Sequence, residues 1–187
     1  MRSKVACPNC GVRMFSFRYA MSDRLHGTTH EQFKIVECRG CGLYRLEPQP
    51  DPAEMHHYYP KLYWASGKTR RGIAGWYRRL VMRDHVRFIR KAIERMGIQC
   101  AKILDIGCGG GYLMGALRAR NHRTFGIDVS RQALRAAAEI GVPAAQADYS
   151  ALPFAEGAFD VVTMFHLLEH IPDPHIAVRS AGALLQP

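Results

Sequence analysis

Apolar and polar residues alternate with two different periods along this chain. In the first fifty residues the period is two, as at Phe15 and Phe17 and again at Phe33 and Ile35, which predicts two short strands. Over residues 73–96 apolar side chains recur every three or four positions, and this period predicts one amphipathic helix. Phe88, Ile89 and Met96 are all expected on the apolar face of that helix.

After residue 99 the pattern changes to short apolar runs separated by helical segments. Strands are expected at residues 102–106, 123–127, 143–147 and 159–165. A last helix is expected from about Pro174 to Leu185. Strands that alternate with helices are typical of an α/β fold with a parallel sheet.

A glycine turn follows the first of these strands. Asp105 lies in the strand, and Gly107, Gly109 and Gly111 follow at alternate positions before the next helix begins. Glycine allows positive φ angles and close approach of a ligand to the backbone, and the carboxyl end of such a strand is where doubly wound folds bind ligands. The dinucleotide fingerprint fails because its sixth position is Tyr112, and no Gly-Lys-Ser/Thr of a P-loop is present.

The acid beside this turn narrows the choice of ligand. An unpaired carboxylate at Asp105 would repel phosphates but suits a cation, and S-adenosylmethionine (SAM) carries both a sulfonium and an ammonium group. Asp128 ends the next strand, 23 positions later, where a carboxylate can accept hydrogen bonds from both ribose hydroxyls. The turn and the two acids together predict a SAM site.

Several further motifs follow in order at matching spacing, and with them the chain resembles the class I SAM-dependent methyltransferases. The motifs are an Asp-x-Gly-x-Gly-x-Gly run at 105–111 and the segments 126–130, 147–148, 152–154, 159–162 and 168–174. The resemblance implies a Rossmann-like methyltransferase sheet, here incomplete with about four strands. An ordinary α/β turn with glycines for packing is the structural alternative.

The resemblance also implies how the cofactor is held. Asp105 and Gly107 would flank the methionine amino group, and Asp128 would hold the ribose. Val129 would pack on the adenine, and Asp148 would accept a hydrogen bond from its amino group. The full set of implied cofactor contacts is Asp105, Gly107, Cys108, Gly109, Gly111, Asp128, Val129, Asp148, Tyr149 and Phe165.

Two histidines after the fourth strand are candidates for the general base. Histidine is the residue type best suited to proton transfer near neutral pH, so His166 or His170 could take the acceptor's proton. A structural cap of the turn at residues 171–172 is an equal alternative for His170. Since the sulfonium already activates the methyl group, alignment of the acceptor is expected to carry most of the rate.

A pair of Cys-x-x-Cys-Gly motifs near the N-terminus predicts a metal site. Cys7 and Cys10 form one turn and Cys38 and Cys41 the other, and four thiolates suit tetrahedral structural zinc in a zinc-ribbon-like module. A rubredoxin-type iron site or two disulfides are the alternatives. Four thiolates fill the coordination sphere, so a catalytic role for this metal is not expected.

The positive charge is confined to the first part of the chain. The chain holds 26 Lys and Arg against 16 Asp and Glu, a net charge of +10, but residues 101–187 hold 7 against 8. A basic N-terminal half favours an anionic partner such as nucleic acid or a lipid surface, although a solvated helix face explains the basic stripe of 73–96 more simply.

The expected methyl acceptor is a small molecule, a sugar or a lipid-linked intermediate. An rRNA or tRNA methyltransferase and a non-catalytic binding module are the alternatives.

These patterns predict three regions. Residues 1–50 are expected as the zinc-ribbon-like module and residues 51–98 as a linker with an aromatic box (58–64, packing or lid) and the basic helix. Residues 99–187 are expected as the first part of the SAM-binding domain. Only four of the family's seven strands are placed, so the chain is expected to be a fragment or a natural truncation, and activity of this stretch alone is left open. No apolar run of 18 residues and no signal-peptide core are present, which predicts a cytoplasmic protein.

Overall fold

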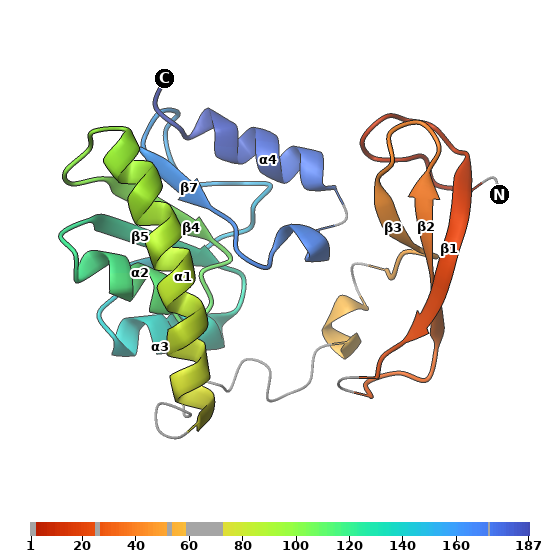
Figure 1. Cartoon of the computed structure of the whole chain (residues 1–187), viewed down its shortest axis with the longest axis horizontal. Coiled ribbons are helices and arrows are strands. Elements are labelled where there is room, and N and C mark those ends of the chain that lie inside the picture. The colour runs from red at the N-terminus through yellow and green to blue at the C-terminus, as the bar shows by residue number, and fades with distance from the viewer. Residues whose placement is uncertain (1–2, 25–26, 52–53, 59–72, 172) are drawn as a thin grey trace. The chain divides into compact units, whose positions relative to one another are not determined.

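The computed structural model describes residues 3–24, 27–51, 54–58, 73–171 and 173–187, with the side chains of 55, 56 and 73–79 left out. The chain divides into two compact units, residues 1–63 with 172–175 and residues 64–171 with 176–187. Figure 1 shows both units, and each is described by itself. The predicted aromatic box, apart from Tyr58, lies outside the described residues.

The first unit is built on a three-stranded antiparallel sheet in the order β1-β2-β3. Its strands are β1 (Phe15–Ser22), β2 (Gln32–Cys38) and β3 (Tyr44–Glu47), and a 3₁₀ turn, η1 (Met55–Tyr58), follows. The two strands expected from the two-residue period are confirmed. β3 had not been predicted as a strand, because a run of four residues carries too few alternations to indicate one.

The core of this unit is small and includes two of the cysteines. Cys7, Phe15, Val36 and Cys38 are buried together. β1 meets β2 with Phe15 opposite Cys38, and a register shift between Phe17 and Tyr19 interrupts the alternation. So few apolar side chains form a marginal core, and domains of this size commonly need a metal or disulfides for stability.

The second unit contains a four-stranded parallel sheet in the order β6-β5-β4-β7. The strands are β4 (Lys102–Ile106), β5 (Arg123–Asp128), β6 (Ala144–Gln146) and β7 (Val161–Thr163). The helices are α1 (Ile73–Arg95), α2 (Tyr112–Arg118), α3 (Arg131–Glu139) and α4 (Pro174–Ala183), with a 3₁₀ turn, η3 (Leu168–His170). The predicted Rossmann-like α/β fold is confirmed.

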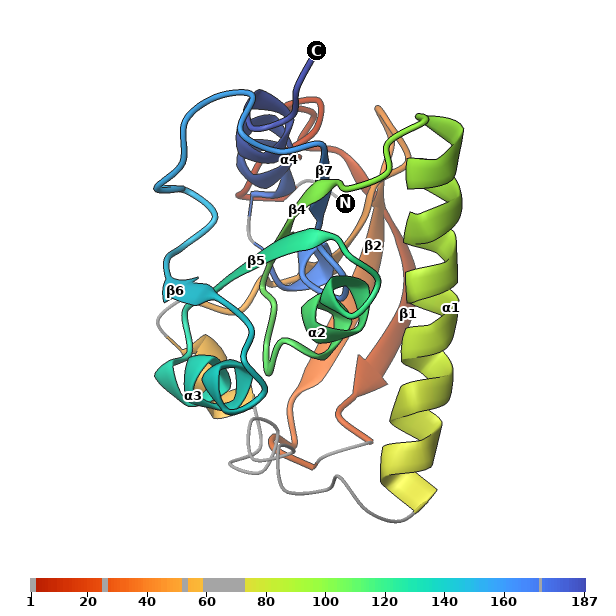
Figure 2. The same cartoon turned by 90° about the vertical axis from the view of Figure 1, so that its left-hand side faces the viewer.

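Two apolar clusters cover the two faces of this sheet. Ile103 points to the face where α1, α2 and α3 pack, whereas Leu104 and Ile106 point to the face covered by α4 (Figure 2). This alternation follows from the two-residue period of a strand. Because both faces are covered, β4 carries apolar residues on both of them, at Ile103, Leu104 and Ile106.

Three details of the prediction were wrong. The fourth strand covers only Val161–Thr163, because Phe159 bridges to Leu185 instead of continuing the ladder with β4. Phe88 and Met96 were expected on the buried face of α1, but their exposed fractions are 71% and 50%. Val86, Ile89 and Ile93 form the buried stripe instead, because the face that meets the sheet is narrower than the predicted one. None of the described helices is long and apolar enough to cross a membrane.

Candidate functional site

The glycine turn joins β4 to α2 and is held against β5 by backbone hydrogen bonds. The amides of Gly107 and Cys108 both donate to the carbonyl oxygen of Ile127, at 2.8 and 2.9 Å. Gly107, Gly109 and Gly111 have φ angles of 75°, 53° and 71°, a region that side chains with a Cβ rarely adopt. The alternate glycines are therefore required by the path of the backbone.

Asp128 closes the turn from the end of β5. Its Oδ2 accepts a hydrogen bond from the amide of Gly109 at 2.8 Å, and its Oδ1 accepts one from the amide of Ser130 at 2.8 Å. The Ser130 hydroxyl in turn accepts from the amide of Ala133 and caps α3, as expected of a serine at this position. The Asp128 side chain is buried, and each oxygen keeps lone-pair capacity for one more donor.

Asp105 lies near the end of β4 and is almost fully buried. Its Oδ1 accepts a hydrogen bond from the hydroxyl of Thr163 at 2.7 Å, across the β4–β7 pair in which the two residues are opposite each other. Burial raises the pKa of Asp105 to about 7; the hydrogen bond from Thr163 opposes this rise and the negative charge of Asp128 adds to it. A cationic ligand beside Asp105 would favour its charged form.

Cys108 fills the space between the turn and β5. A Cβ placed on Gly126 would lie only 2.5 Å from the Cys108 sulfur. The two chain segments can therefore approach this closely only with glycine at position 126. Burial raises the pKa of Cys108 to about 12, and the charges of Asp105 and Asp128 add to the effect. The Cys108 thiol is therefore neutral, and its sulfur donates to the carbonyl of Gly109 in the turn at 3.6 Å.

The residues predicted to surround the adenine lie after β5 and β6. Val129 follows Asp128 directly and has an exposed fraction of 59%, which is unusual for valine. Asp148 is exposed, and its Oδ1 accepts hydrogen bonds from the amide and hydroxyl of Ser150 at 2.9 and 2.7 Å. Tyr149 packs partly buried against the cluster under α4.

The residues after β7 include the predicted base. His166 has a φ angle of 54°, which is rare for a residue with a side chain, and its Nδ1 is 3.6 Å from Oε1 of Glu169. His170 ends η3 and is exposed, and its amide donates to the carbonyl of Leu167. Phe165 packs partly buried against the cluster that includes α1.

The four predicted metal ligands of the first unit converge. The sulfur atoms of Cys7, Cys10, Cys38 and Cys41 all lie within 4.8 Å of one another. The Cys7–Cys41 and Cys10–Cys38 sulfur distances are 3.6 and 3.5 Å. Four sulfurs held tetrahedrally at about 2.3 Å from zinc would be about 3.8 Å apart, so this cluster fits the ion with little movement.

Both Cys-x-x-Cys turns are shaped by the glycine that follows the second cysteine. The amide of Gly11 donates to the carbonyl of Cys7, and that of Gly42 to the carbonyl of Cys38, each at 2.9 Å and each with a positive φ angle. A backbone hydrogen bond from Leu43, followed by one from the side chain of Asn9, lowers the pKa of Cys41 to about 6. The pKa of Cys38 is also lowered, whereas the pKa of Cys7 is raised and that of Cys10 is raised to about 12, so the thiolate form is favoured at Cys38 and Cys41.

Arg45 ties the N-terminal segment to β3. Its guanidinium is buried, donates to the hydroxyl of Ser3 and the carbonyls of Val5 and Ala6, and pairs with Glu47 at 2.7 Å. The guanidinium carbon lies 4.2 Å from the centre of the Phe15 ring. Arg45 thereby holds in place the segment that leads into the first Cys-x-x-Cys turn.

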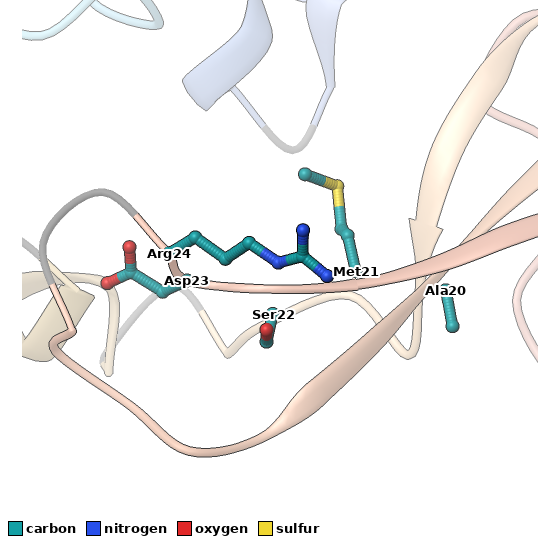
Figure 3. Close-up of a pocket in the computed structure, with 5 residues that line it drawn as sticks. All are labelled: Ala20, Met21, Ser22, Asp23 and Arg24. Atoms are coloured by element: carbon teal, nitrogen blue, oxygen red, sulfur yellow. The ribbon is translucent and has the colours of Figure 1, made fainter.

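A shallow hollow lies at the end of β1 and is lined by residues 20–24 (Figure 3). Met21 and Ser22 point to opposite sides of the chain there. None of these residues belongs to the predicted cofactor, metal or base sets, so the hollow adds nothing to the candidate site.

Comparison with known proteins agrees with this geometry. Residues 104–187 match the family described as "Methyltransferase domain". The matched segment is slightly less than half of the chain, and it is similar to that family over its whole length. A ubiquinone biosynthesis O-methyltransferase of Pseudomonas aeruginosa is 41% identical over 101 residues, which cover 50% of this chain and 44% of the relative. Another of Chromobacterium violaceum is 38% identical over 96 residues, covering 46% and 40%. The chain thus spans less than half the length of these curated relatives.

A solved structure of a SAM-dependent methyltransferase from Methanosarcina mazei is 26% identical to the part of this chain that it matches. The match covers 48% of this chain and 49% of that one, with a TM-score of 0.45.

Four residues that shape the two sites had not been predicted. Thr163 and Arg45 carry no local signal, because each acts on a partner in another strand or segment. Gly126 begins the motif at 126–130, but its close approach to Cys108 had not been expected. His85, whose ring stacks near Phe165, could have been found as a polar residue on the apolar stripe of α1, four residues from both Val81 and Ile89.

Proposed function

We propose that this chain transfers a methyl group from SAM to a hydroxyl group of a small molecule. The observation that carries the proposal is the pair of buried acids, Asp105 and Asp128, on either side of the glycine turn of a methyltransferase-family segment. When bound, SAM supplies an electrophilic methyl group that needs no activation by the protein. The chain's own residues have to hold it, orient the acceptor and accept a proton.

The geometry supports a role for each of the cofactor residues. Asp128 has one hydrogen bond on each oxygen from the backbone and room for ribose hydroxyls as further donors. Asp105, whose pKa is raised to about 7, would be held in its charged form by the amino group of the methionine part. The exposed Val129 offers an apolar surface to the adenine, and Asp148 would accept from its amino group. Gly107, Cys108, Gly109 and Gly111 contribute backbone, and Tyr149 and Phe165 would flank the site.

A hydroxyl acceptor is supported by the two relatives, which are named as O-methyltransferases. A phenolic hydroxyl, with a pKa of about 10, can lose its proton to an imidazole far more easily than an aliphatic hydroxyl can. We assign the role of base to His166, whose Glu169 partner would stabilise the imidazolium. His170 is the second candidate.

We further propose that the four cysteines hold a structural zinc ion. The donor set, the sulfur spacing and the small core of the first unit support this assignment. Residues 1–50 then form a zinc-ribbon-like module, and residues 99–187 carry the methyltransferase site.

The test uses the full chain and two measurements. Isothermal titration with S-adenosylhomocysteine asks whether the site binds the product of the cofactor, and Asp128→Asn is the matched variant that should lose binding. Transfer of labelled methyl from SAM is then measured with catechol and with a fractionated cell extract. Failure of the wild-type chain to bind S-adenosylhomocysteine would reject the proposal. Label found in RNA or glycan would reject the small-molecule acceptor alone.

A further inference from the structure

A histidine of α1 lies beside the predicted base. The rings of His85 and Phe165 have centroids 4.3 Å apart, and those of His85 and His166 have centroids 5.8 Å apart in an edge-to-face arrangement. His85 comes from the helix that precedes the sheet, whereas Phe165 and His166 follow β7, so the contact joins segments about eighty residues apart. Neither the cofactor site nor the assigned base accounts for His85.

The surroundings of His85 are unusual for a histidine that only fills space. Its Nδ1 is buried and has no hydrogen-bond partner among the described residues. A buried polar atom without a partner is costly and therefore rare. The tautomer with the proton on Nε2 avoids burying an unpaired N–H at Nδ1, and it leaves Nε2–H as a donor.

Burial and a neighbouring imidazole favour the neutral form of His85. Burial lowers the pKa of His85, and the positive charge that His166 can carry lowers it further, while Asp84 on the same helix acts in the opposite direction. Glu169 lies beyond His166, 3.6 Å from its Nδ1. The pair thus contains one neutral imidazole and one exposed imidazole with a carboxylate behind it.

We propose that His85 is a second acceptor-side catalytic residue, so that the hydroxyl of the methyl acceptor is held between His85 and His166. This inference rests on the proposed methyl transfer and assigns the acceptor's place within it. A hydroxyl oxygen that makes hydrogen bonds of about 2.8 Å to two nitrogens can span up to about 5.6 Å between them. The ring centroids of His85 and His166, 5.8 Å apart, make the two imidazoles direct neighbours.

Each imidazole then has a separate task in the transfer. The acceptor oxygen accepts a hydrogen bond from Nε2–H of His85 and donates its own hydrogen to Nε2 of His166. As the oxygen forms its bond to the methyl carbon, the carbon–sulfur bond breaks and its electron pair stays on sulfur. The hydroxyl proton moves to His166, where Glu169 stabilises the imidazolium, and then leaves to solvent because His166 is exposed.

The position of His166 supports this division of tasks. Its φ angle of 54° places it in the left-handed region, which costs free energy for a residue with a side chain. Such conformations persist where the surrounding structure requires a particular direction for the side chain.

The test begins with binding, so that it does not depend on turnover. Full-length chain labelled at histidine with ¹³C and ¹⁵N is saturated with S-adenosylhomocysteine and titrated with catechol. The imidazole signals of His85 and His166 should both shift, and the nitrogen shifts of His85 should show the Nε2–H tautomer. The variant His85→Phe keeps a ring against Phe165 and removes the donor, and Arg87→Gln on the exposed side of the same helix is its control.

In His85→Phe, the affinity for S-adenosylhomocysteine should stay within about twofold of wild type, while methyl transfer to catechol falls about tenfold or more. His85→Gln, which can still donate, should recover part of that loss. Suppose that the wild-type chain binds S-adenosylhomocysteine and that His85→Phe transfers methyl at the wild-type rate. That result overturns this inference and leaves the proposed function intact. Catechol that shifts neither histidine overturns it as well. Absence of any binding to the wild-type chain overturns both.

Discussion

The carboxylate of Asp128 accepts a hydrogen bond from the amide of Gly109 across the glycine turn, with 2.8 Å between Oδ2 and the nitrogen. The acid that ends β5 therefore fixes the turn that begins α2, in addition to the ribose contact proposed for it. Its second oxygen is bonded to the amide of Ser130 at the start of α3. One buried side chain thus couples the shape of the cofactor turn to the helix on the next strand.

Replacement of Asp128 by Asn should loosen the turn and weaken cofactor binding together. An amide has one acceptor oxygen, so its NH₂ group would face one of the two backbone N–H donors and leave it unpaired, at a cost of about 1–3 kcal/mol. We expect a lower melting temperature and at least a tenfold loss of S-adenosylhomocysteine affinity by titration calorimetry. Glu156→Gln, an exposed acid in the same unit, should change neither quantity.

Cofactor affinity should depend on pH through Asp105. The folded-state pKa of about 7 is above the ordinary value of 3.8, so Asp105 stabilises the fold most below pH 4 and that contribution is lost as the pH rises to about 7. A cationic ligand prefers the ionised form, so affinity should rise as the pH increases through 7. Calorimetric titrations from pH 5.5 to 8.5 should show this rise in wild type and not in Asp105→Asn. An identical slope in both chains would show that other groups are responsible.

Gly126→Ala should destabilise the fold, because the added Cβ would lie 2.5 Å from the sulfur of Cys108. Overpacking of this kind costs about 1–3 kcal/mol in the free energy of unfolding, measured by urea denaturation. The second substitution Cys108→Ala should recover only part of the loss, since the Cβ of residue 108 would remain 2.8 Å away. Gly115→Ala, a helical position with ordinary contacts at 3.5 Å, should be neutral or stabilising.

The cysteine cluster should hold one zinc ion per chain, measured by elemental analysis after dialysis. Cys41→Ser removes a ligand from a tetrahedral set and should release the metal and lower the cooperativity of melting, because the metal-binding free energy of such small modules is also folding free energy. Cys100→Ser, an exposed cysteine outside the cluster, is the control and should retain full zinc content. Iron in place of zinc would leave the structural role unchanged and correct only the identity of the ion.

Arg45→Met should destabilise the first unit strongly. The substitution leaves Glu47 without its partner and removes the hydrogen bonds to the N-terminal segment, and loss of one member of a buried ion pair costs about 3 kcal/mol or more. Arg39→Met, at an exposed position of the same unit, should change the stability by less than about 0.5 kcal/mol. Chemical denaturation of the zinc-loaded chains compares the two.

Much of this molecule follows from local patterns in the sequence. The order of strands and helices after residue 99, the turn at Gly107–Gly111, the cap at Ser130 and the four cysteines are all visible as spacing along the chain. Each depends on the backbone geometry of a few consecutive residues, such as the period of a strand, the positive φ angle of glycine or the reach of a Cys-x-x-Cys turn. These features could be predicted because no distant partner is needed to define them.

The contacts that give the site its chemistry were decided only by the tertiary structure. Asp105 meets Thr163 because β4 and β7 pair in one register, and His85 meets Phe165 and His166 because α1 packs on the face of the sheet beside the end of β7. Parallel pairing and helix packing are set by the fit of whole apolar surfaces. When packing brings two polar residues together in this way, the sequence around one of them does not indicate which residue is its partner.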